Sequence, residues 1–389
     1  MKNILITGGA GFIGSNFIIY FLEKYPQYKI INLDSLTYAG NLANLKEIEK
    51  SGNYHFIQGD ICDRALVEEI FREFEIESVI HFAAESHVDN SIANPSVFVK
   101  TNVNGTFNLL HNAYLSWFHS PHTPKKDKES CIFHHISTDE VFGTLGKSGS
   151  FSESSPYAPN SPYSASKASS DMLVRSYFHT YGMKTFITNC SNNYGPKQHD
   201  EKLIPTIIRN ALLNKQIPIY GDGLNVRDWL FVLDHIRGID KVFHSKYFGE
   251  SFNIGGNCEK TNIDLDKEIC LILDKKIPRN DGKSYTSLIA FVKDRAGHDK
   301  RYAIDSSKIS TKLNFSISNS TEENLASTID FYINKYTKIG GGWSHRENLA
   351  YLLYYLLLIK LYNFYYLRFK FFIFLFNLFI TFIPFARQK

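Results

Sequence analysis

The chain has 389 residues, of which 43% are hydrophobic and 21% charged, so it can bury a large core and form about two domains. Its formal charge is +4, but the residues from Gly341 onward hold six Lys/Arg and one Glu, which leaves residues 1–340 at about −1. A body so close to neutrality, without a basic stripe or a nucleic-acid motif, argues against nucleic acid as a partner.

Cysteine usage and the N-terminus point to a cytoplasmic protein. The five cysteines are scattered, odd in number and without the close pairs of zinc sites or thiol redox motifs, so we expect free thiols and no metal site. The first apolar run, Ile4 to Ile6, is too short for a secretory signal.

Strand-like segments alternate with helical patterns from the N-terminus onward. These segments are KNILIT, YKIINLD, YHFIQGD, SVIHFAA, CIFHHIS, KTFITNC and ESFNIGG. The alternation predicts an α/β fold, a Rossmann-type doubly wound parallel sheet. We expect this domain at residues 1–190, with residues 226–256 returning to it, and a smaller α/β substrate lobe mainly at residues 191–338. The substrate is expected between the two.

A glycine motif follows the first predicted strand. Gly8, Gly11 and Gly14 have the GxxGxxG spacing of short-chain dehydrogenases, in which glycine lets the backbone approach a pyrophosphate at a helix N-terminus. Asp34 ends the next strand, where a carboxylate accepts the ribose hydroxyls and repels the 2′-phosphate of NADP, so the expected cofactor is NAD. Asp60 fits either an adenine contact or a turn or helix cap. Further expected cofactor contacts are Phe12, Ile13, Ile61, Ala83 and Ala84.

Tyr163 and Lys167 lie four residues apart, on one face of a helix expected to begin near Pro162. An ammonium near a phenol favours the phenolate, so we expect the pKa of Tyr163 to be lowered toward the range where it accepts a proton. The same spacing also occurs on ordinary amphipathic helices. Here it follows a nucleotide motif in the order that a dehydrogenase requires.

Two acids follow the strand CIFHHI directly, in the segment Ser137-Thr138-Asp139-Glu140. The carboxyl ends of parallel strands form the ligand crevice of such sheets. The segment resembles the STDEVYG motif of the dTDP-glucose 4,6-dehydratase family, with Phe142 in place of the usual Tyr. The resemblance extends from Met1 to about Lys338 through LDSLTYAGNL, AAESHVD, SPYSASKASSD, TNCSNNYGP, EKLIP, RDWL and AGHDKRYAID.

The resemblance implies a dehydration in which NAD is regenerated in every turnover. Tyr163 takes the C4 hydroxyl proton while the C4 hydride passes to NAD, and Thr138 and Lys167 orient and polarise the developing carbonyl. Glu140 then removes the C5 proton and Asp139 protonates the departing C6 hydroxyl, which requires opposite protonation states on neighbouring carboxyls. The hydride is finally returned to C6.

The resemblance also implies further contacts, although each of these residues alone would also fit an ordinary surface position. Thr101 and Asn193 are expected at the cofactor, and the resemblance implies a homodimer. Ala296 replaces a usual Pro in a segment expected at the phosphates. The expected substrate contacts, beside Thr138, are His87, Asn192, Lys202, Leu203, Pro218, Ile219, Tyr220, Arg227, Asn262, Arg295 and His298.

Three alternatives stay open. A UDP-glucose 4,6-dehydratase would use the same chemistry on a substrate with another nucleobase. A sugar-nucleotide 4-epimerase would share the glycine motif, Tyr163 and Lys167 but would not need the acid pair after Thr138. A non-catalytic NAD-binding scaffold would be expected to lose Tyr163 or Lys167, and both are present.

The tail at residues 339–389 differs in character from the rest of the chain. From Trp343 onward it holds 16 aromatic residues among 47, and its apolar runs, Leu349 to Ile359 and Phe371 to Phe385, are shorter than the ~20 residues that cross a bilayer. It fits an interfacial or hairpin membrane anchor, a packed or aggregation-prone appendage, or sequence never selected for folding. Membrane contact is expected only through residues 343–389.

Overall fold

A computed structural model describes residues 2–294, 299–317 and 320–340. Its centre is a seven-stranded sheet in the order β12-β8-β7-β4-β1-β2-β3, in which every pair of neighbours is parallel. All seven predicted strands lie in this sheet, which confirms the predicted fold class. The strands are β1 (Lys2–Thr7), β2 (Tyr28–Asp34), β3 (Tyr54–Gln58), β4 (Ser78–His81), β7 (Ile132–Thr138), β8 (Thr185–Cys190) and β12 (Ser251–Ile254).

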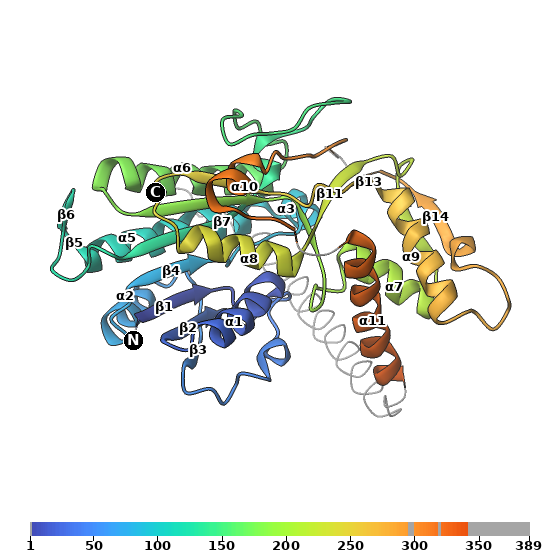
Figure 1. The fold of residues 1–389 in the computed structure, drawn as a ribbon, viewed down its shortest axis with the longest axis horizontal. Coiled ribbons are helices and arrows are strands. Elements are labelled where there is room, and N and C mark those ends of the chain that lie inside the picture. Colours follow the sequence, from blue (N-terminus) through green and yellow to red (C-terminus); the bar gives the residue numbers. More distant parts are fainter. Residues whose placement is uncertain (1, 295–298, 318–319, 341–389) are drawn as a thin grey trace, which may run out of the picture. The chain divides into compact units, whose positions relative to one another are not determined.

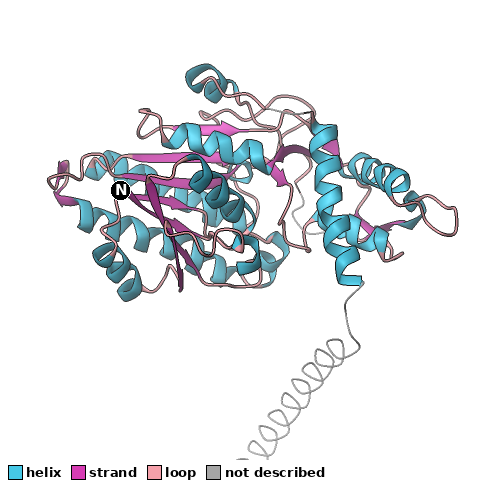
Figure 2. Ribbon diagram, turned by 60° about the horizontal axis from the view of Figure 1, so that its bottom comes forward, coloured by secondary structure: helices cyan, strands magenta, loops and turns pink. Residues whose placement is uncertain are grey.

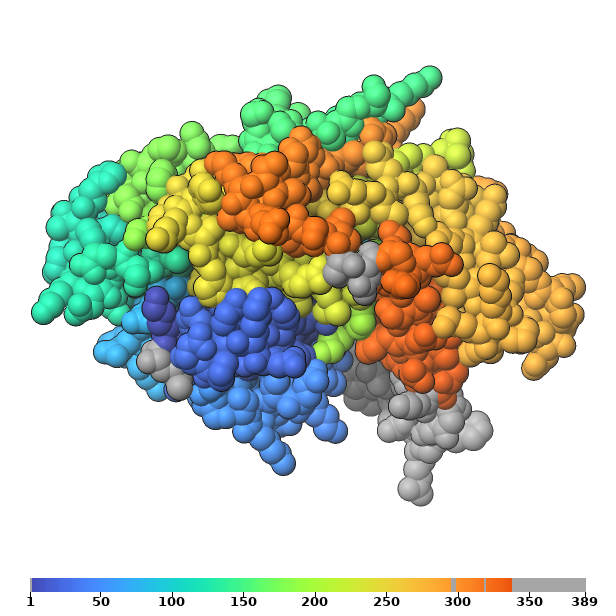
Figure 3. Space-filling view, viewed as in Figure 1, coloured from blue at the N-terminus to red at the C-terminus, as the bar shows by residue number. Residues whose placement is uncertain are grey.

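Helices cover both faces of this sheet (Figures 1 and 2). Successive residues of β1 enter different cores: Ile4 and Ile6 join one, and Leu5 joins the other, as strand alternation requires. The first core includes residues of α1 (Phe12–Lys24), α8 (Val232–Phe243) and α10 (Ser307–Leu313). The second includes residues of α2 (Arg64–Glu73), α5 (Thr106–Trp117) and α6 (Pro162–Tyr181). Figure 3 shows the blue α1 region beside yellow α8.

The connection after β4 is mostly helical. It runs through α3 (Val88–Ala93), α4 (Pro95–Phe98) and a π-helical stretch, η2 (Val99–Gly105), before α5. A π-helical stretch of this kind is frequent at functional sites. The segment at residues 120–130 holds part of a short antiparallel ribbon of β5 (Phe118–Ser120) and β6 (Thr123–Pro124).

Smaller elements follow β8. A three-stranded sheet orders β13 (Glu259–Thr261), β11 (Val226–Phe231) and β9 (Asn192–Tyr194), and β10 (Ile217–Tyr220) pairs with β14 (Ile289–Val292). α7 (Leu203–Leu212) packs on α9 (Asn262–Lys276). Of residues 226–256, β12 is a strand of the large sheet and α8 packs in the core on one face of that sheet, whereas β11 belongs to the smaller sheet. The proposed domain boundaries therefore stay a prediction. The remaining elements are 3₁₀ turns η1 (Leu42–Leu45), η3 (Asp139–Phe142) and η4 (Tyr285–Leu288), and α11 (Thr321–Gly340).

The described residues up to 333 belong to one compact unit, and residues 334–340 are assigned to a second. From residue 341 onward the tail lies outside the described residues, so its three interpretations stay expectations. Among the described residues, no helix is both long and apolar enough to cross a membrane.

Candidate active site

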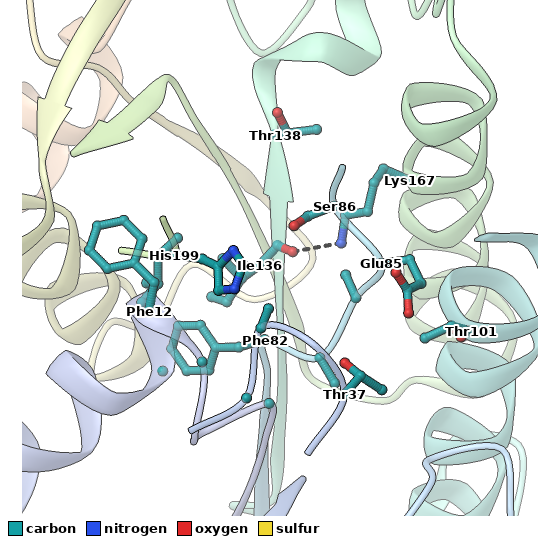
Figure 4. A pocket seen from close by; sticks show the side chains of 18 of the residues that line it. Phe12, Thr37, Phe82, Glu85, Ser86, Thr101, Ile136, Thr138, Lys167 and His199 are labelled. Atoms are coloured by element: carbon teal, nitrogen blue, oxygen red, sulfur yellow. Dashed lines mark hydrogen bonds between the residues drawn. The ribbon is translucent and has the colours of Figure 1, made fainter. Parts of the chain in front are cut away.

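A cleft of about 510 Å³ lies at the carboxyl ends of the central strands, with residues of β1, β2, β4 and β7 or of the loops after them in its wall. Figure 4 shows Lys167 from α6 and Thr138 from the end of β7 facing this space. All of the expected cofactor and catalytic residues line it: Gly8, Gly11, Phe12, Ile13, Gly14, Asp34, Asp60, Ile61, Ala83, Ala84, Thr101, Thr138, Asp139, Glu140, Tyr163, Lys167 and Asn193.

The glycine loop permits a close backbone approach at two points. Gly8 has φ +71°, and a Cβ there would lie 2.6 Å from the backbone nitrogen of Ala83. A Cβ on Gly14 would lie 2.4 Å from the carbonyl oxygen of Gly8. The first helix starts directly behind this loop, and its N-cap, Gly11, has no side-chain cap. Its first N–H groups are therefore suited to an anionic ligand such as a pyrophosphate.

Asp34 lies at the end of β2 and is tied to the glycine loop. Its Oδ2 accepts from Ala10 N–H at 2.9 Å, and its Oδ1 accepts from Leu36 N–H at 2.8 Å. Burial raises the pKa of this carboxyl, and the two backbone donors oppose the rise. The second lone pair of each oxygen can accept from a ribose hydroxyl.

Asp60 has the turn role and also lies at the cleft wall, while its adenine contact stays a prediction. Its Oδ1 accepts from Cys62 N–H at 2.9 Å, which is the turn role, and its Oδ2 accepts from Lys100 at 3.2 Å at the cleft wall. Partial burial opposes ionisation, but these donors outweigh it and lower the pKa of Asp60. Asp60 thus presents a carboxylate at the far end of the cleft, with Lys100 beside it.

Helix α6 begins at Pro162, as expected, and carries both Tyr163 and Lys167. Ser161 caps it in a reciprocal capping box with Ser164, and Pro162 occupies the first turn. Lys167 is 4% exposed and donates to the carbonyl oxygen of Ile136 at 2.8 Å, the dashed line in Figure 4.

The expectation of a lowered pKa for Tyr163 is not met in this arrangement. Burial raises its pKa well above the ordinary value, and the charge of Glu140 adds to the rise, while a hydrogen bond with Thr138 opposes it. Lys167 donates to the backbone of β7 at Ile136. Lowering the phenol pKa therefore needs a further positive charge in the cleft.

The acid pair lies on the 3₁₀ turn after β7. Thr138 caps this turn: its Oγ1 accepts from Glu140 N–H at 3.3 Å and lies 3.3 Å from Asp139 Oδ1. Asp139 is 2% exposed, and burial raises its pKa well above the ordinary value, followed by the charges of Glu140 and Asp228. Burial of this kind favours the protonated form of a carboxyl, which is the form that can act as an acid.

The expected substrate residues are only partly gathered at the cleft. Asn192 and Lys202 line it, and Lys202 donates to Ser86 O at 3.2 Å. His87 Nε2 lies 3.9 Å from the carboxylate of Glu201, a cleft residue. Arg295 and His298 lie outside the described residues. The others do not line the cleft: Leu203 opens α7, Pro218, Ile219 and Tyr220 lie on β10, Arg227 on β11, and Asn262 opens α9.

Arg227 does not line the cleft, but it is close enough to influence the pKa of Asp139. It is buried, donates to the carbonyl oxygens of Val226 and Asp299, and stacks over the Tyr302 ring at 4.4 Å. Its positive charge partly offsets the rise in the pKa of Asp139. The Arg227 guanidinium therefore lies close enough to Asp139 for its charge to act on that carboxyl.

Sequence and structure comparisons agree with this geometry. The family model described as GDP-mannose 4,6 dehydratase matches residues 5–328. A dTDP-glucose 4,6-dehydratase from Xanthomonas campestris is 49% identical over 341 residues, 88% of this chain and 96% of that protein. The chain belongs to the dTDP-glucose 4,6-dehydratase family.

Solved structures of the family show the same fold. The dTDP-glucose 4,6-dehydratase from Bacillus anthracis, in complex with NAD, has a TM-score of 0.75 and 45% identity, covering 86% of this chain and 97% of that chain. The dTDP-glucose 4,6-dehydratase from Streptomyces venezuelae, with NAD and TYD bound, has a TM-score of 0.76 and 44% identity, with the same coverage.

Asn102 is a residue of this family member that the sequence did not single out. It is 1% exposed and lies on η2, where its amide accepts from Glu85 N–H at 2.8 Å and donates to Glu85 O at 3.0 Å and Ser166 Oγ at 2.8 Å. It thus joins the β4 loop to α6. The cleft also includes the unforeseen Thr37, Phe82, Ser86, Lys100, Gln198 and His199. Their positions after strand ends were the available signal.

Proposed function

We propose that this chain converts dTDP-glucose into dTDP-4-keto-6-deoxyglucose and water, with NAD as a cofactor that is regenerated in each turnover. The observation that carries the proposal is the catalytic turn: the buried Asp139, whose pKa is raised, stands next to the partly accessible Glu140, in one cleft with Tyr163 and Lys167. An acid and a base next to each other are what elimination of water across C5 and C6 requires.

The residues of the cleft fit NAD. Gly8, Gly11 and Gly14 leave space for a pyrophosphate at the start of α1, and Asp34 offers acceptors for two ribose hydroxyls while repelling a 2′-phosphate. Asp60, with Lys100 beside it, is placed for the adenine end. When bound, NAD supplies the two-electron acceptor for C4 and a positively charged ring that favours ionisation of a neighbouring phenol.

In the first step Tyr163 accepts the proton of the C4 hydroxyl. Its burial beside Glu140 keeps the phenol protonated, so Tyr163 must first release this proton to solvent; the positive charge of bound NAD would favour that release, and the resulting phenolate then accepts the C4 hydroxyl proton. Thr138 hydrogen-bonds the same phenol and can donate to the oxygen at C4. The Lys167 ammonium is held in the cleft by its hydrogen bond to Ile136 O, and its charge stabilises the negative charge that develops on the C4 oxygen.

In the second step the C4 ketone acidifies the C5 hydrogen, and the two carboxyl groups act in opposite directions. Glu140 removes the C5 proton. Asp139 donates its proton to the C6 hydroxyl, which leaves as water. Both groups lie on the short turn η3, which Thr138 caps. Glu140 then returns its proton to C5 as the regained hydride completes C6.

Three alternatives compete with this proposal. A sugar-nucleotide 4-epimerase would need no proton donor at C6, so the buried, protonated Asp139 would have no task. A UDP-glucose 4,6-dehydratase would share every catalytic group named above, and only the contacts to the base would differ. A non-catalytic NAD-binding scaffold is disfavoured because Tyr163, Lys167 and the acid pair meet in one cleft.

A product assay tests the proposal. The full-length protein is incubated with NAD and one sugar nucleotide in each of three reactions. The substrates are dTDP-glucose, UDP-glucose and GDP-mannose, and the sugar product of each reaction is identified. We expect a 4-keto-6-deoxy sugar from dTDP-glucose at the highest kcat/KM. Formation of a 4-epimer without any 4-keto-6-deoxy sugar would reject dehydration, and faster turnover of UDP-glucose would reject the nucleotide assignment.

The proposal includes a homodimer in the cytoplasm. Phe107 and Leu115 are 47% and 49% exposed on one face of α5, and Met172 is 49% exposed on α6, which packs beside α5. Such an apolar surface suits an isologous helix pair. All five cysteines are free, which suits a reducing compartment. Light scattering tests the assembly: Phe107→Lys with Leu115→Lys is expected to give monomers, and an unchanged mass would place the interface elsewhere.

A further inference from the structure

Behind the catalytic helix lies a buried chain of three titratable side chains: Lys167, His135 on β7, and Asp171 one turn further along α6. His135 Nε2 lies 3.3 Å from Lys167 Nζ and 3.3 Å from Asp171 Oδ1. The three residues are between 0% and 4% exposed. Lys167 lines the cleft, whereas His135 and Asp171 do not. The chain therefore links a group in the active site to an acid that cannot touch the substrate.

The second oxygen of Asp171 is surrounded by donors. Ser137 Oγ donates to Oδ2 at 2.8 Å, Tyr157 OH at 2.9 Å and Asn189 Nδ2 at 3.4 Å. Asn189 also donates to Thr138 O at 3.1 Å. An ionised carboxylate is acceptor-only, so this set of donors matches the charged form of Asp171. The same set fixes the end of β7, directly before the acid pair.

His135 can serve only one of its two neighbours with Nε2. Burial lowers its pKa well below the ordinary value, and the charge of Lys167 lowers it further, so the imidazole is neutral. Among the described residues, its Nδ1 has no hydrogen-bond partner. An ammonium can only donate, so Lys167 Nζ donates to His135 Nε2, and a second N–H donates to Ile136 O. Asp171 Oδ1 lies 3.3 Å from the same Nε2 but has no hydrogen-bond partner among the described residues, so Asp171 acts on Lys167 through its charge. One Lys167 N–H is left for the cleft.

The charge of Lys167 depends on Asp171. Burial lowers the pKa of Lys167 to about 8, and the charge of Asp171 is the largest influence that opposes burial. Burial raises the pKa of Asp171 to about 6, against the charge of Lys167 and the three donors. Cys190 on β8 and His81 on β4 also face Lys167; burial raises the thiol pKa and keeps His81 neutral, so neither replaces Asp171 at neutral pH.

We infer that Asp171 is a positioning residue for the oxidation at C4: its charge, on the far side of His135, keeps Lys167 protonated, so that one N–H remains for the cleft beyond the bonds to His135 and Ile136. The inference rests on the proposed function for the step that it assists, but the link between Asp171 and Lys167 is a property of the protein alone. It assigns Asp171 no contact with substrate or cofactor. Elimination at C5 and C6, which depends on Asp139 and Glu140, does not need it.

The first experiment measures the charge of Lys167 directly, in the full-length protein with NAD. Lysine labelled with ¹³C at Cε is titrated by NMR, and the Lys167 signal is assigned by its loss in Lys167→Arg. In Asp171→Asn we expect the pKa of Lys167 to fall by about one unit or more, since an opposite charge at this range has been removed. Asp266→Asn is the matched control, because Asp266 is an equally buried acid outside the chain of residues. It should leave the Lys167 pKa unchanged.

The second experiment follows the rate of C4 oxidation against pH. Asp171 ionises above about 6 and Lys167 loses its proton above about 8, so the wild-type rate should be highest between these values. In Asp171→Asn the alkaline limb should move to lower pH, and Asp171→Glu should restore part of it. Tyr157→Phe removes one donor from Asp171 Oδ2, so the acid limb should move to higher pH.

The kinetic isotope effect of substrate deuterated at C4 separates a positioning role from a general structural one. In Asp171→Asn the effect should rise, because C4 oxidation becomes slower relative to elimination. An unchanged Lys167 pKa in Asp171→Asn, or rates of both steps reduced equally at every pH, would overturn the inference. Absence of dehydratase activity in the wild type would instead defeat the proposed function, and the NMR titration would still decide whether Asp171 controls Lys167. If Asp171→Asn does not retain NAD, the pH profile of Tyr157→Phe tests the inference instead. An acid limb at higher pH supports it, and an unchanged acid limb overturns it.

Discussion

The hydroxyl of Thr138 donates to Oδ1 of Asp139 at 3.3 Å. The hydroxyl oxygen of Thr138 also accepts from Glu140 N–H, so one side chain contacts both residues of the acid pair. Asp139 is buried while Glu140 is partly accessible, and this difference favours the proton on Asp139. Two adjacent carboxyl groups thereby acquire opposite tasks through their surroundings alone.

Asp139→Asn is expected to stop the loss of water while leaving the earlier proton removal possible. An amide has the shape of the protonated acid but cannot transfer a proton, so overall turnover should fall by about 100- to 10,000-fold. Exchange of the C5 hydrogen with deuterated water, followed by NMR, should continue. A loss of C5 exchange equal to the loss of turnover would show that Asp139 is not the acid at C6.

Glu140→Gln is expected to give the reverse pattern. The base at C5 is lost, so C5 exchange should slow by about 100-fold or more, while C4 oxidation remains possible because Tyr163 and Lys167 are intact. Single-turnover absorbance of the reduced nicotinamide measures the oxidation, and NMR measures the exchange. Equal loss of both steps contradicts the assignment of Glu140.

Gly14→Ala is expected to weaken NAD binding and to destabilise the fold by about 1–3 kcal/mol, because its Cβ would lie 2.4 Å from Gly8 O. Gly52→Ala is the matched control, since a Cβ there has nothing within 4 Å. Calorimetry of NAD binding and thermal unfolding measure both effects. Similar losses in the two variants would mean that the close contact in the glycine loop is unimportant.

Asp240 is expected to control acid stability of the packing between α1 and α8. Its Oδ2 accepts from Lys24 at 2.7 Å and Tyr20 at 2.7 Å, and its Oδ1 lies 2.8 Å from His244 Nδ1. Burial opposes ionisation, but these partners outweigh it and lower the pKa of Asp240 to about 2. A lowered folded-state pKa stabilises the fold above the unfolded-state value of 3.8, and this contribution is lost as the pH falls toward 2.

Asp240→Asn should therefore destabilise the protein at neutral pH, by about 1–3 kcal/mol for a buried acid with a half-exposed partner. Its unfolding free energy should also depend less on pH between 4 and 2. Urea unfolding at several pH values measures both. An identical pH dependence in variant and wild type would show that Asp240 does not supply this stability.

The sequence predicted the elements whose signal is local. The apolar runs predicted the seven strands of the large sheet, and Pro162 predicted the start of α6. The glycine spacing and Asp34 identified the cofactor end of the cleft. A close backbone approach there requires glycine, and a pair of ribose hydroxyls requires a carboxylate.

Features that depend on distant contacts could not be predicted in this way. The pKa of Tyr163 was expected to fall because Lys167 is four residues away, but burial and Glu140 decide it, and burial is a property of the whole fold. Asn102 looks like an ordinary helix residue until η2 places it against Glu85 and Ser166. The placement of β11 in the smaller sheet likewise depends on its pairing with β9 and β13.

The central claim, dehydration through transient oxidation at C4, is tested most directly by following one hydrogen. The full-length protein with NAD is given dTDP-glucose deuterated at C4, and the product is examined by NMR and mass spectrometry. We predict dTDP-4-keto-6-deoxyglucose that carries the deuterium at C6. A product that retains the deuterium at C4 with inverted configuration, or a 6-deoxy sugar whose C6 hydrogen comes from water, would contradict the account.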